Sequence, residues 1–344
     1  MRVSRIAGTG LEDIYTHAMQ PVSAITTVLN EAKDIPQLIT SLMAQEPPLT
    51  EVIVVDGGST DGTWEWLEQA AARWPTLKAI RDVTCSLKYT PGPVSKGRNV
   101  AIAAAQTELV ACADCGCRYR PDWAANLTAP LKSGEARYAL GGSCLDMTNP
   151  TVWDLASAPF FGVKLAEEKT NKSCTARSMA FTRELWREIG GFPEHVLLGD
   201  DTLFDLKARA LTKPAFVRAR AFYRPHLNLA QALHQMARYA ISDGILGVRL
   251  RRLFRNVARS LAMVAALVAL KWTWIPLAVV GTLELYFAFR LDWLFARTQK
   301  PHVLLARLFF SLLVPWIVAV NQVRGALTKK NPTNAQNRRN AQAD

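Results

Sequence analysis

Short apolar runs alternate with helix-period segments over residues 21–131 of the chain. The run Val22–Val28 is rich in β-branched residues, and the ranges 52–55, 77–80 and 109–113 are further apolar runs of strand length. Apolar residues recur with helical spacing between these runs, which predicts helices over 35–45, 63–73, 96–105 and 121–131. Such alternation with short connections predicts an α/β fold whose sheet is mainly parallel and flanked by helices.

Residues 133–225 are less regular. We expect strands over 139–144 and 180–182 and one helix just before Gly190-Gly191. A further helix is expected from Asp200 to Ala210, with Asp205 on its solvated face.

Two of the expected strands run directly into aspartates. Asp56 follows the strand 52–55, and Asp114 follows the strand 109–113. In parallel sheets ligands bind in the crevice outside the carboxyl ends of the strands. We therefore expect Asp56 and Asp114 to point into one crevice.

The region after residue 258 is strongly apolar, in contrast to the mixed composition before residue 225. Two runs, 261–270 and 275–289, are separated by Lys271-Trp-Thr-Trp274. Because a crossing needs about 20 residues, we interpret them as two short crossings in a tight hairpin, with a single tilted span as the alternative. The third run, Leu308–Val320, contains Pro315 and its length favours an interfacial or re-entrant helix. A buried core helix of a soluble domain is the simpler alternative.

The charge balance supports a membrane surface as partner. The formal net charge is +12, and a group of basic residues precedes the first long apolar run while a second group lies in the tail. Basic residues that flank apolar segments are typical of the cytoplasmic face, and no nucleic-acid-binding motif accompanies the charge. The basic residues of these groups are Arg249, Arg251, Arg252, Arg255, Arg259, Lys329, Lys330, Arg338 and Arg339.

The cysteines indicate a reducing compartment. There are six of them, and residues 1–20 lack the apolar core of a signal peptide, so disulfides are not expected. Cys112, Cys115 and Cys117 lie on one short segment without a second Cys/His pair at zinc spacing, which argues against a zinc site.

The segment Val52–Thr63 carries the clearest candidate chemistry. Asp56 is followed by two glycines and a serine, so a flat ring can approach the backbone while the carboxylate accepts hydrogen bonds from a base and a ribose. An ordinary strand-to-helix loop, with Asp61 as the helix-entry residue, is the alternative. Gly97-Arg98-Asn99 opens a helix, and both a helix amino end and an arginine favour a diphosphate.

These segments together resemble the family 2 glycosyltransferases, which have the nucleotide-sugar-binding GT-A fold. The resemblance covers residues 20–240 and rests on the order of several short motifs rather than on any single one. They are Val22–Glu31, Val52–Thr63, Gly92–Asn99, Asp114, Gly190-Gly-Phe192, Gly199-Asp-Asp-Thr202 and Gln235-Met-Ala-Arg-Tyr239.

The resemblance implies a donor site and a divalent cation. Asn30, Glu31 and Asp56 would bind the nucleotide sugar together with Arg98 and Asn99. Asp114 matches the first position of the family's Asp-x-Asp motif, which binds Mg²⁺ or Mn²⁺ across the donor diphosphate. The third position here is Gly116, so one carboxylate is missing, as in an Asp-x-Gly-Cys variant. His226 stands where some members place a further metal or phosphate ligand.

The resemblance also implies an inverting mechanism. Asp200-Asp201 matches the family's Glu-Asp pair, so Asp201 would be the general base and Asp200 would contact substrate. Gln235, Arg238 and Tyr239 share one helix face and would meet the diphosphate and the acceptor. Tyrosine in place of the family's tryptophan favours single transfer over polymerisation.

The expected protein is therefore a membrane-attached inverting glycosyltransferase of the cytoplasmic membrane, with its catalytic domain in the cytoplasm. Its donor would be a UDP- or GDP-sugar and its acceptor a lipid-linked or glycan molecule. We expect a leader over 1–20, the GT-A domain over 21–240, a basic and then apolar membrane region over 241–325, and a basic disordered tail over 326–344. The alternative is a catalytically inactive nucleotide-sugar-binding or scaffold protein. A nucleotidyltransferase would need a basic Gly-rich loop after the first strand, which residues 29–34 do not supply.

Overall fold

The structure is a computed structural model that describes residues 20–163, 174–225, 227–295 and 300–330. The chain divides into two compact units. The described part of the sheet unit comprises residues 20–142, 174–195 and 200–221. The described part of the helical unit comprises residues 143–163, 196–199, 222–225, 227–295 and 300–330.

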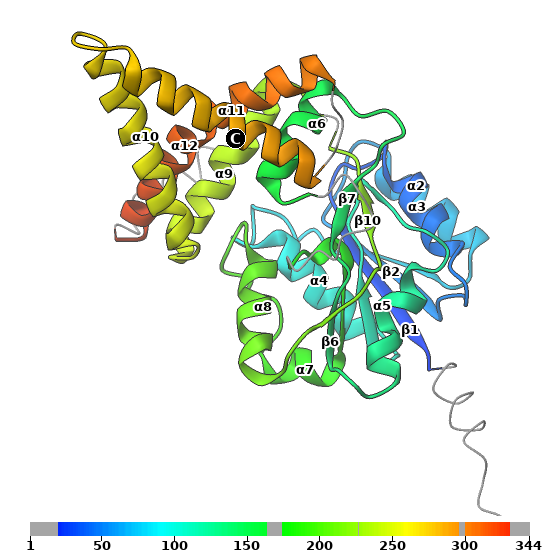
Figure 1. The fold of residues 1–344 in the computed structure, drawn as a ribbon. Coiled ribbons are helices and arrows are strands. Elements are labelled where there is room, and N and C mark those ends of the chain that lie inside the picture. The colour runs from blue at the N-terminus through cyan, green and yellow to red at the C-terminus, as the bar shows by residue number, and fades with distance from the viewer. Residues whose placement is uncertain (1–19, 164–173, 226, 296–299, 331–344) are drawn as a thin grey trace, which may run out of the picture. The chain divides into compact units, whose positions relative to one another are not determined.

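The sheet unit is built on a seven-stranded sheet with strand order β3-β2-β1-β4-β8-β6-β9 (Figure 1). The β1 strand pairs in parallel with β2 and β4, and β2 pairs in parallel with β3. The β8 strand is antiparallel to β4 and β6, so the prediction of a mainly parallel sheet is confirmed. The strands are β1 (Val22–Val28), β2 (Glu51–Asp56), β3 (Leu77–Arg81), β4 (Leu109–Cys112), β6 (Tyr138–Leu140), β8 (Met179–Thr182) and β9 (Ala215–Phe216), with the short β5 (Cys117–Arg118) outside this sheet.

Helices flank this sheet. The α4 helix contacts β1 and β2, and α5 contacts β4, β6 and β8 (Figure 1). The α4 helix begins three residues earlier than expected because Pro93 occupies its first turn, where the missing N–H has no helical partner to lose. The helices are α2 (Ile35–Met43), α3 (Thr63–Arg73), α4 (Pro93–Ala104), α5 (Trp123–Lys132), α7 (Arg183–Glu188) and α8 (Asp200–Leu211), with a 3₁₀ turn η2 at Ala176–Ser178.

The single strand expected over 139–144 is wrong. Two short strands, β6 and β7 (Ser143–Leu145), flank Gly141 and Gly142 instead. Gly142 has a positive φ of 78°, which strands do not adopt. A Cβ on Gly141 would lie 1.9 Å from the carbonyl oxygen of Ala219, so the backbone passes too close for any side chain.

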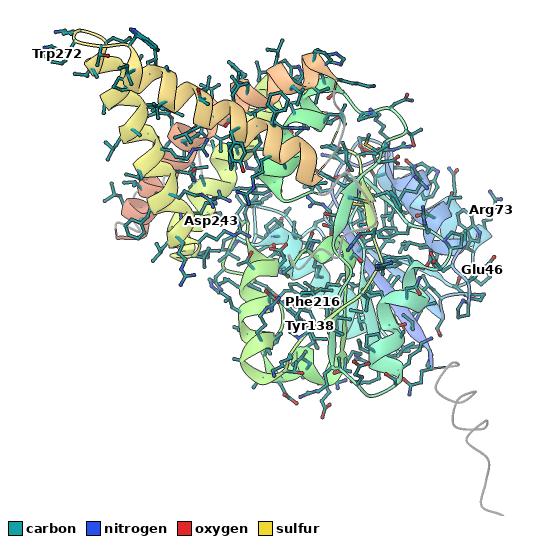
Figure 2. The ribbon with its side chains drawn as sticks, in the orientation of Figure 1. Glu46, Arg73, Tyr138, Phe216, Asp243 and Trp272 are labelled. Atoms are coloured by element: carbon teal, nitrogen blue, oxygen red, sulfur yellow. The ribbon has the colours of Figure 1, made fainter. Side chains whose placement is uncertain are left out.

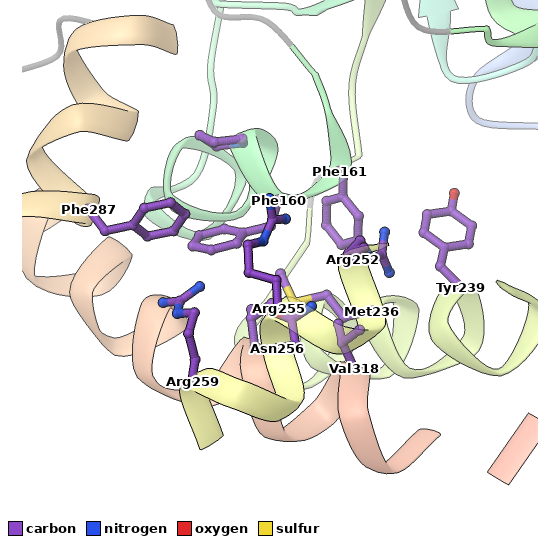
Figure 3. A pocket seen from close by; sticks show the side chains of 12 residues that line it. Phe160, Phe161, Met236, Tyr239, Arg252, Arg255, Asn256, Arg259, Phe287 and Val318 are labelled. Carbon is purple, nitrogen blue, oxygen red and sulfur yellow. The ribbon is translucent and has the colours of Figure 1, made fainter. Parts of the chain in front are cut away.

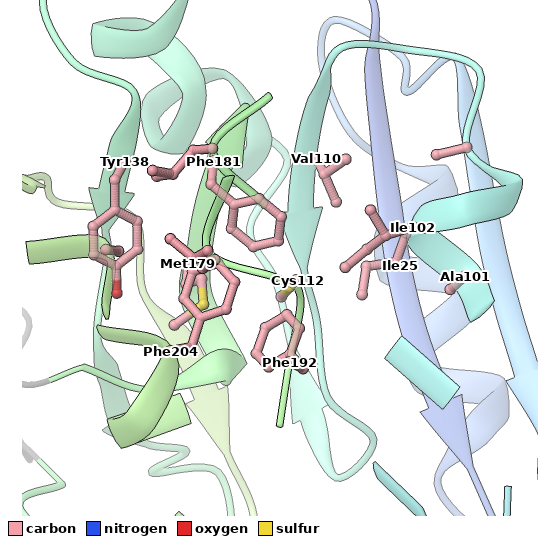
Figure 4. Close-up of a cluster of buried hydrophobic side chains, with 14 of the residues drawn as sticks. Ile25, Ala101, Ile102, Val110, Cys112, Tyr138, Met179, Phe181, Phe192 and Phe204 are labelled. Atoms are coloured by element: carbon pink, nitrogen blue, oxygen red, sulfur yellow. The ribbon is translucent and has the colours of Figure 1, made fainter. Parts of the chain in front are cut away.

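The core of the sheet unit lies between α4, the sheet and α8. Figure 4 shows Ile25 and Val110 from the strands, Ile102 from α4, and the rings of Phe181, Phe192 and Phe204 in one cluster. The rings of Phe192 and Phe204 stack with centroids 4.4 Å apart. Phe192 therefore ties the Gly190-Gly-Phe192 turn to α8, which begins with Asp200 and Asp201.

The described residues of the helical unit form four long helices and two short helical segments. Besides β7 it includes most of β10 (Ala221–Tyr223), which lies beside β7. Its helices are α6 (Val152–Ser157), η1 (Ala158–Phe161), α9 (Leu229–Leu246), α10 (Leu250–Ala269), α11 (Ile275–Phe295) and α12 (Pro301–Lys330).

Two glycines allow α9 and α12 to approach closely. A Cβ on Gly325 would lie 2.1 Å from the carbonyl oxygen of Ile241, and a Cβ on Gly244 would lie 2.0 Å from that of Gln322. The apolar layer beside this seam includes Met236, Phe310 and Val314. Small residues at a helix contact bring the backbones together, so these glycines fix the α9–α12 packing.

The expectation of a short third apolar helix is wrong. The α12 helix runs from Pro301 to Lys330 and continues through Pro315. Among the described residues, one helix, Pro301–Thr328, is long and apolar enough to cross a bilayer by length and composition, and 50 % of its most apolar stretch is buried. The runs 261–270 and 275–289 form the end of α10 and most of α11, joined by a turn that carries Trp272 at the tip of the hairpin (Figure 2).

Candidate active site

The carboxyl edge of the sheet gathers several of the expected site residues. In the register of the parallel strands Val28 lies beside Asp56, and Asp56 lies beside Arg81. Asp114 follows β4, the other neighbour of β1. This edge therefore carries Asn30 and Glu31 after β1, Asp56 at the end of β2, and Asp114 after β4.

Asp56 is fully buried at the end of β2. Its Oδ1 accepts hydrogen bonds from the amides of Gly58 (2.8 Å) and Ser59 (2.9 Å). Its Oδ2 is buried and has no hydrogen-bond partner among the described residues. A buried carboxylate oxygen without a donor costs free energy, so Oδ2 is a ready acceptor for a ligand N–H or O–H.

The loops after β1 and β2 are joined by hydrogen bonds. The amide of Thr60 donates to Asn30 Oδ1 (2.9 Å), and the amide of Asn30 donates to Ser59 Oγ (2.8 Å). The amide of Glu31 donates to Thr63 Oγ1 (2.8 Å). Asn30 has a positive φ of 56°, a region that Asn adopts more readily than most residues. These bonds fix the loop around Asp56 in one conformation.

Arg98 links two carboxylates that are far apart in the sequence. Its Nη2 lies 2.7 Å from Asp114 Oδ1, and its Nη1 pairs with Asp200 Oδ2. The Arg98 side chain is only 5 % exposed and lies over the ring of Phe192, with 5.4 Å between guanidinium and centroid. Burial opposes its charge, but Asp114 and Asp200 raise the pKa of Arg98 above its usual value. The structure thus brings the expected metal motif and the expected base motif to one cation.

Asp200 and Asp201 differ in environment although they are adjacent. Burial raises the pKa of Asp200 against the opposing effect of Arg98, and the charges of Asp201 and Asp114 add to the rise. Asp201 is half-buried and makes no ion pair among the described residues; its Oδ1 accepts from the amide of Thr202 at 2.7 Å. The Asp200 carboxylate is therefore committed to the internal pair with Arg98, whereas the Asp201 carboxylate is not.

Asp205, one turn further along α8, is not on a solvated face as expected. Its side chain is 14 % exposed and accepts hydrogen bonds from the hydroxyl of Tyr138 (3.1 Å) and from Nε of Arg209 (2.7 Å). Tyr138 belongs to strand β6, so its hydrogen bond to Asp205 anchors α8 to the sheet. This role is structural.

Glu31 lies next to the Asp114 segment. Burial raises the pKa of Glu31, as do the charges of Asp34, Asp61 and Asp114, while a hydrogen bond with the Cys115 thiol lowers it. The contact of Glu31 with Cys115 joins the loop after β1 to the loop after β4. Sequence reasoning considered Cys115 only as a metal ligand and missed this contact.

The described residues contain no group of three His, Cys, Asp or Glu side chains that could hold a metal ion. Asp114, whose side chain is 28 % exposed, can offer one carboxylate. Mg²⁺ is often held by one or two carboxylates together with substrate phosphates, so this donor set is compatible with a cation that binds along with a diphosphate. His226, the other expected ligand, lies outside the described residues.

Asn99 is fully engaged inside the sheet unit. Its Nδ2 donates to the carbonyl of Phe192 (2.9 Å) and to Glu194 (2.8 Å), and its Oδ1 accepts from the amide of Phe192 (2.8 Å) and from Trp186 Nε1 (3.1 Å). All its polar atoms thus hold the turn that carries Phe192. We infer that Asn99 positions Phe192 beneath Arg98, and its expected contact with donor stays a prediction.

The remaining expected residues lie on α9, in the helical unit. Gln235 Nε2 donates to the hydroxyl of Tyr239 (3.2 Å), one turn away. The ring of Phe161 meets that of Tyr239 edge-on, with centroids 5.8 Å apart. Arg238 is exposed. The substrate contacts of these three residues stay predictions.

Arg81 is a residue that the sequence reasoning missed. Its Nη2 donates to the carbonyl of Ser59 (3.2 Å), and its Nε lies 3.9 Å from Asp56 Oδ1. It also lies over the ring of Trp64, 5.3 Å from the centroid. Only the register of the strands places Arg81 beside Asp56, because Arg81 ends β3 where Asp56 ends β2.

Comparisons with known proteins find a matching family model and a curated relative. The family model described as glycosyl transferase family 2 matches residues 23–190. Glycosyltransferase AglE of Haloferax volcanii is 25 % identical over 198 residues, which is 56 % of this chain. The match spans 62 % of the length of AglE.

A solved structure has a similar fold. The mannosyltransferase PcManGT of Pyrobaculum calidifontis, solved in complex with GDP-Man and Mn²⁺, is 20 % identical and superposes with a TM-score of 0.53. The similarity covers 92 % of this chain and 89 % of that protein. The expected GT-A-like α/β fold is confirmed, and the match to the family 2 model is confined to residues 23–190.

Proposed function

We propose that the protein is an inverting glycosyltransferase that moves a sugar from a nucleoside-diphosphate sugar to a lipid-linked or glycan acceptor. The family match over residues 23–190 supports glycosyl transfer. One geometric observation carries the proposal: Arg98 holds Asp114 and Asp200 together while the adjacent Asp201 is left without an ion pair among the described residues.

The donor would bind along the carboxyl edge of the sheet. Asp56 Oδ2, buried and unpartnered, would accept a hydrogen bond from the base or ribose. Asn30 and Glu31 lie on the loop that is hydrogen-bonded to the Asp56 loop. The donor would be a UDP- or GDP-sugar.

Asp201 would act as the general base. Its carboxylate takes the proton from the acceptor hydroxyl while the oxygen attacks the anomeric carbon, and the bond to the nucleoside diphosphate breaks with its electron pair on the leaving phosphate. A single displacement of this kind inverts the anomeric centre. Asp200, held by Arg98, keeps the start of α8 in position. Asp114 would hold a divalent cation, which would supply charge stabilisation for the leaving diphosphate.

The alternative is a protein of the same fold that binds a nucleotide sugar without transferring it. Gly116, where the family's motif has a carboxylate, is the one feature that favours this reading, and its φ of 74° suits glycine. Binding and turnover must therefore be measured separately.

The test uses the full-length protein with a panel of UDP- and GDP-sugars, with and without Mn²⁺. Donor binding is followed by thermal shift, and turnover by release of free nucleoside diphosphate. We expect Asp201→Asn to lower turnover about 10²- to 10⁴-fold with donor binding within about twofold, as for loss of a general base. Asp56→Asn should instead weaken donor binding about tenfold, since one acceptor becomes a donor.

Asp205→Asn is the matched control, because it makes the same charge change on the same helix and keeps an acceptor for Tyr138 and Arg209. Turnover in this variant should stay within about twofold of the wild type. Donor binding without any turnover in the wild type would favour the inactive alternative. Equal losses in the Asp201 and Asp205 variants would remove Asp201 from the mechanism.

Membrane attachment through the helical unit is a second part of the proposal. Trp272 and Trp274, at the α10–α11 turn, are 78 % and 71 % exposed, and apolar residues are exposed along both helices. Tryptophans at the end of an apolar hairpin favour the membrane interface. Replacement of both tryptophans by serine should reduce co-flotation of the protein with anionic vesicles, and unchanged flotation would exclude the hairpin as the anchor.

A further inference from the structure

A pocket of about 270 Å³ lies entirely within the helical unit. Its walls come from η1, α9, α10, α11 and α12 (Figure 3). The floor is one face of α10, and aromatic rings stand opposite it. The pocket therefore differs from the carboxylate-rich edge of the sheet unit in the side chains that form it.

Three arginines of α10 line this pocket. Arg252, Arg255 and Arg259 are three and four residues apart and so share one helix face, and no Asp or Glu is among the lining residues. The charges of two of them are paired with carboxylates that do not line the pocket: Arg252 lies 3.3 Å from Asp243, and Arg259 pairs with Glu284. Arg255 has no ion-pair partner among the described residues. One uncompensated guanidinium thus faces the pocket.

Asn256 is a second, independent feature. Its side chain lines the pocket, the residue is only 3 % exposed, and its side chain makes no hydrogen bond among the described residues. The side-chain amide offers N–H donors to the same pocket that Arg255 lines. A guanidinium without a counter-charge together with an amide donor suits an anionic oxygen group.

The other walls are apolar. Phe160, Phe161 and Phe287 present rings to the pocket, and Met236 and Val318 complete it (Figure 3). The Arg259 guanidinium already lies over the Phe287 ring, 4.5 Å from its centroid. The neighbouring turns of α10, α11 and α12 expose further large apolar side chains, including Leu261, Leu283 and Leu312. A free phosphate would gain nothing from such walls, whereas an apolar chain attached to a phosphate would.

We infer that this pocket binds the phosphate group of a lipid phosphate, with Arg255 and Asn256 as its direct donors and the aromatic walls against the first part of the apolar chain. The inference goes beyond the proposed function in naming a ligand and its donors, and it connects to that function in one respect: such a lipid would be the carrier of the acceptor.

The test measures binding of farnesyl monophosphate to the full-length protein in nanodiscs by isothermal calorimetry, with farnesol and inorganic phosphate as the two partial ligands. Arg255→Gln should weaken farnesyl monophosphate binding at least tenfold, and Asn256→Ala at least threefold. The control is Arg251→Gln, which removes the same charge from the same helix but does not line the pocket. Its affinity should stay within about twofold of the wild type.

Several results would overturn the inference. Equal weakening by Arg255→Gln and Arg251→Gln would mean that the lipid is attracted by net charge alone. Inorganic phosphate binding as tightly as farnesyl monophosphate would assign the pocket to a soluble phosphate, and farnesol binding as tightly would remove the phosphate contact. Absence of binding in a protein that still turns over a nucleotide sugar would refute this inference alone, and lipid phosphate binding without turnover would refute only the proposed function. Thermal melts of each variant separate loss of binding from loss of folding.

Discussion

In the sheet unit the buried side chain of Arg98 is held between the carboxylates of Asp114 and Asp200, whereas in the helical unit Arg255 faces a pocket with no carboxylate among its lining residues. A guanidinium between two carboxylates is already compensated, so it fixes the geometry of its neighbours. A guanidinium without a counter-charge is available to an anion from outside. The same residue type thus has an architectural role in one unit and a ligand-binding role in the other.

The largest effect is expected from breaking the Arg98 pairs. Arg98→Met leaves Asp114 and Asp200 without their cation, and removal of one partner of a buried ion pair costs about 3–5 kcal/mol. We expect the free energy of unfolding of the sheet unit to fall by that amount. It is measured by hydrogen exchange of the β1, β2 and β4 amides in increasing urea.

The double variant Arg98→Met/Asp200→Asn provides the control, because it removes one of the two uncompensated carboxylates. It should recover part of the lost stability, and the Arg98 variant should still bind farnesyl monophosphate in the helical unit. A loss below about 1 kcal/mol in the single variant would show that Arg98 does not organise the carboxylates.

The packing of the helical unit gives the next largest effect. Gly325→Ala places a methyl group where the carbonyl oxygen of Ile241 lies 2.1 Å away, so α9 and α12 must separate. Overpacking of this kind costs about 1–3 kcal/mol. Gly281→Ala on α11 is the matched change, because a Cβ there meets nothing within 4 Å, and it should be neutral or slightly stabilising.

The two glycine variants are compared by thermal unfolding of the full-length protein and by farnesyl monophosphate affinity. Gly325→Ala should weaken the lipid phosphate affinity as well, because Met236 of α9 and Val318 of α12 both line the pocket. Equal stability of the two variants would mean that the α9–α12 contact is looser than the structure has it.

The ease of prediction from sequence differed between the two units for a physical reason. Asp56 and Asp114 were predicted to share an edge because a parallel sheet places the carboxyl ends of its strands together, whatever packs around it. The link from Arg98 to Asp200 joins residues 102 positions apart and depends on how α8 packs, which no local pattern encodes. The engagement of Asn99 with the Phe192 turn was missed for the same reason.

The helical unit was harder to predict because its elements depend on each other. The length of the run Leu308–Val320 favours an interfacial or re-entrant helix, yet α12 extends beyond the run at both ends and continues through Pro315, with α9 and α10 packed against it. The arginines of α10 were interpreted only as residues that flank a membrane segment. The pocket that these arginines line is formed by residues from several helices far apart in the sequence, so the sequence of α10 alone does not indicate it.

The smallest predicted effect is a loss of stability of the sheet unit in acid. It concerns Glu51, a second carboxylate of the sheet unit that is paired with a cation, here Lys78. Glu51, at the start of β2, is 3 % exposed. Burial alone would raise its pKa, but hydrogen bonds from Lys78, Ser23 Oγ and the Gln106 amide hold the pKa of Glu51 below its ordinary value of 4.5. A carboxylate whose pKa is lower in the folded state adds stability above the unfolded pKa, and this stability is lost as the pH falls through the folded pKa. The sheet unit should therefore lose stability from this group as the pH falls from about 4.5 through the lower folded pKa of Glu51. Glu51→Gln removes the titrating group, so the stability difference between wild type and variant, measured by urea unfolding, should shrink as the pH falls. A difference that stays constant from pH 7 to pH 3 would mean that Glu51 acts only as a hydrogen-bond acceptor, and that in the sheet unit paired charge contributes geometry without a pH-dependent gain in stability.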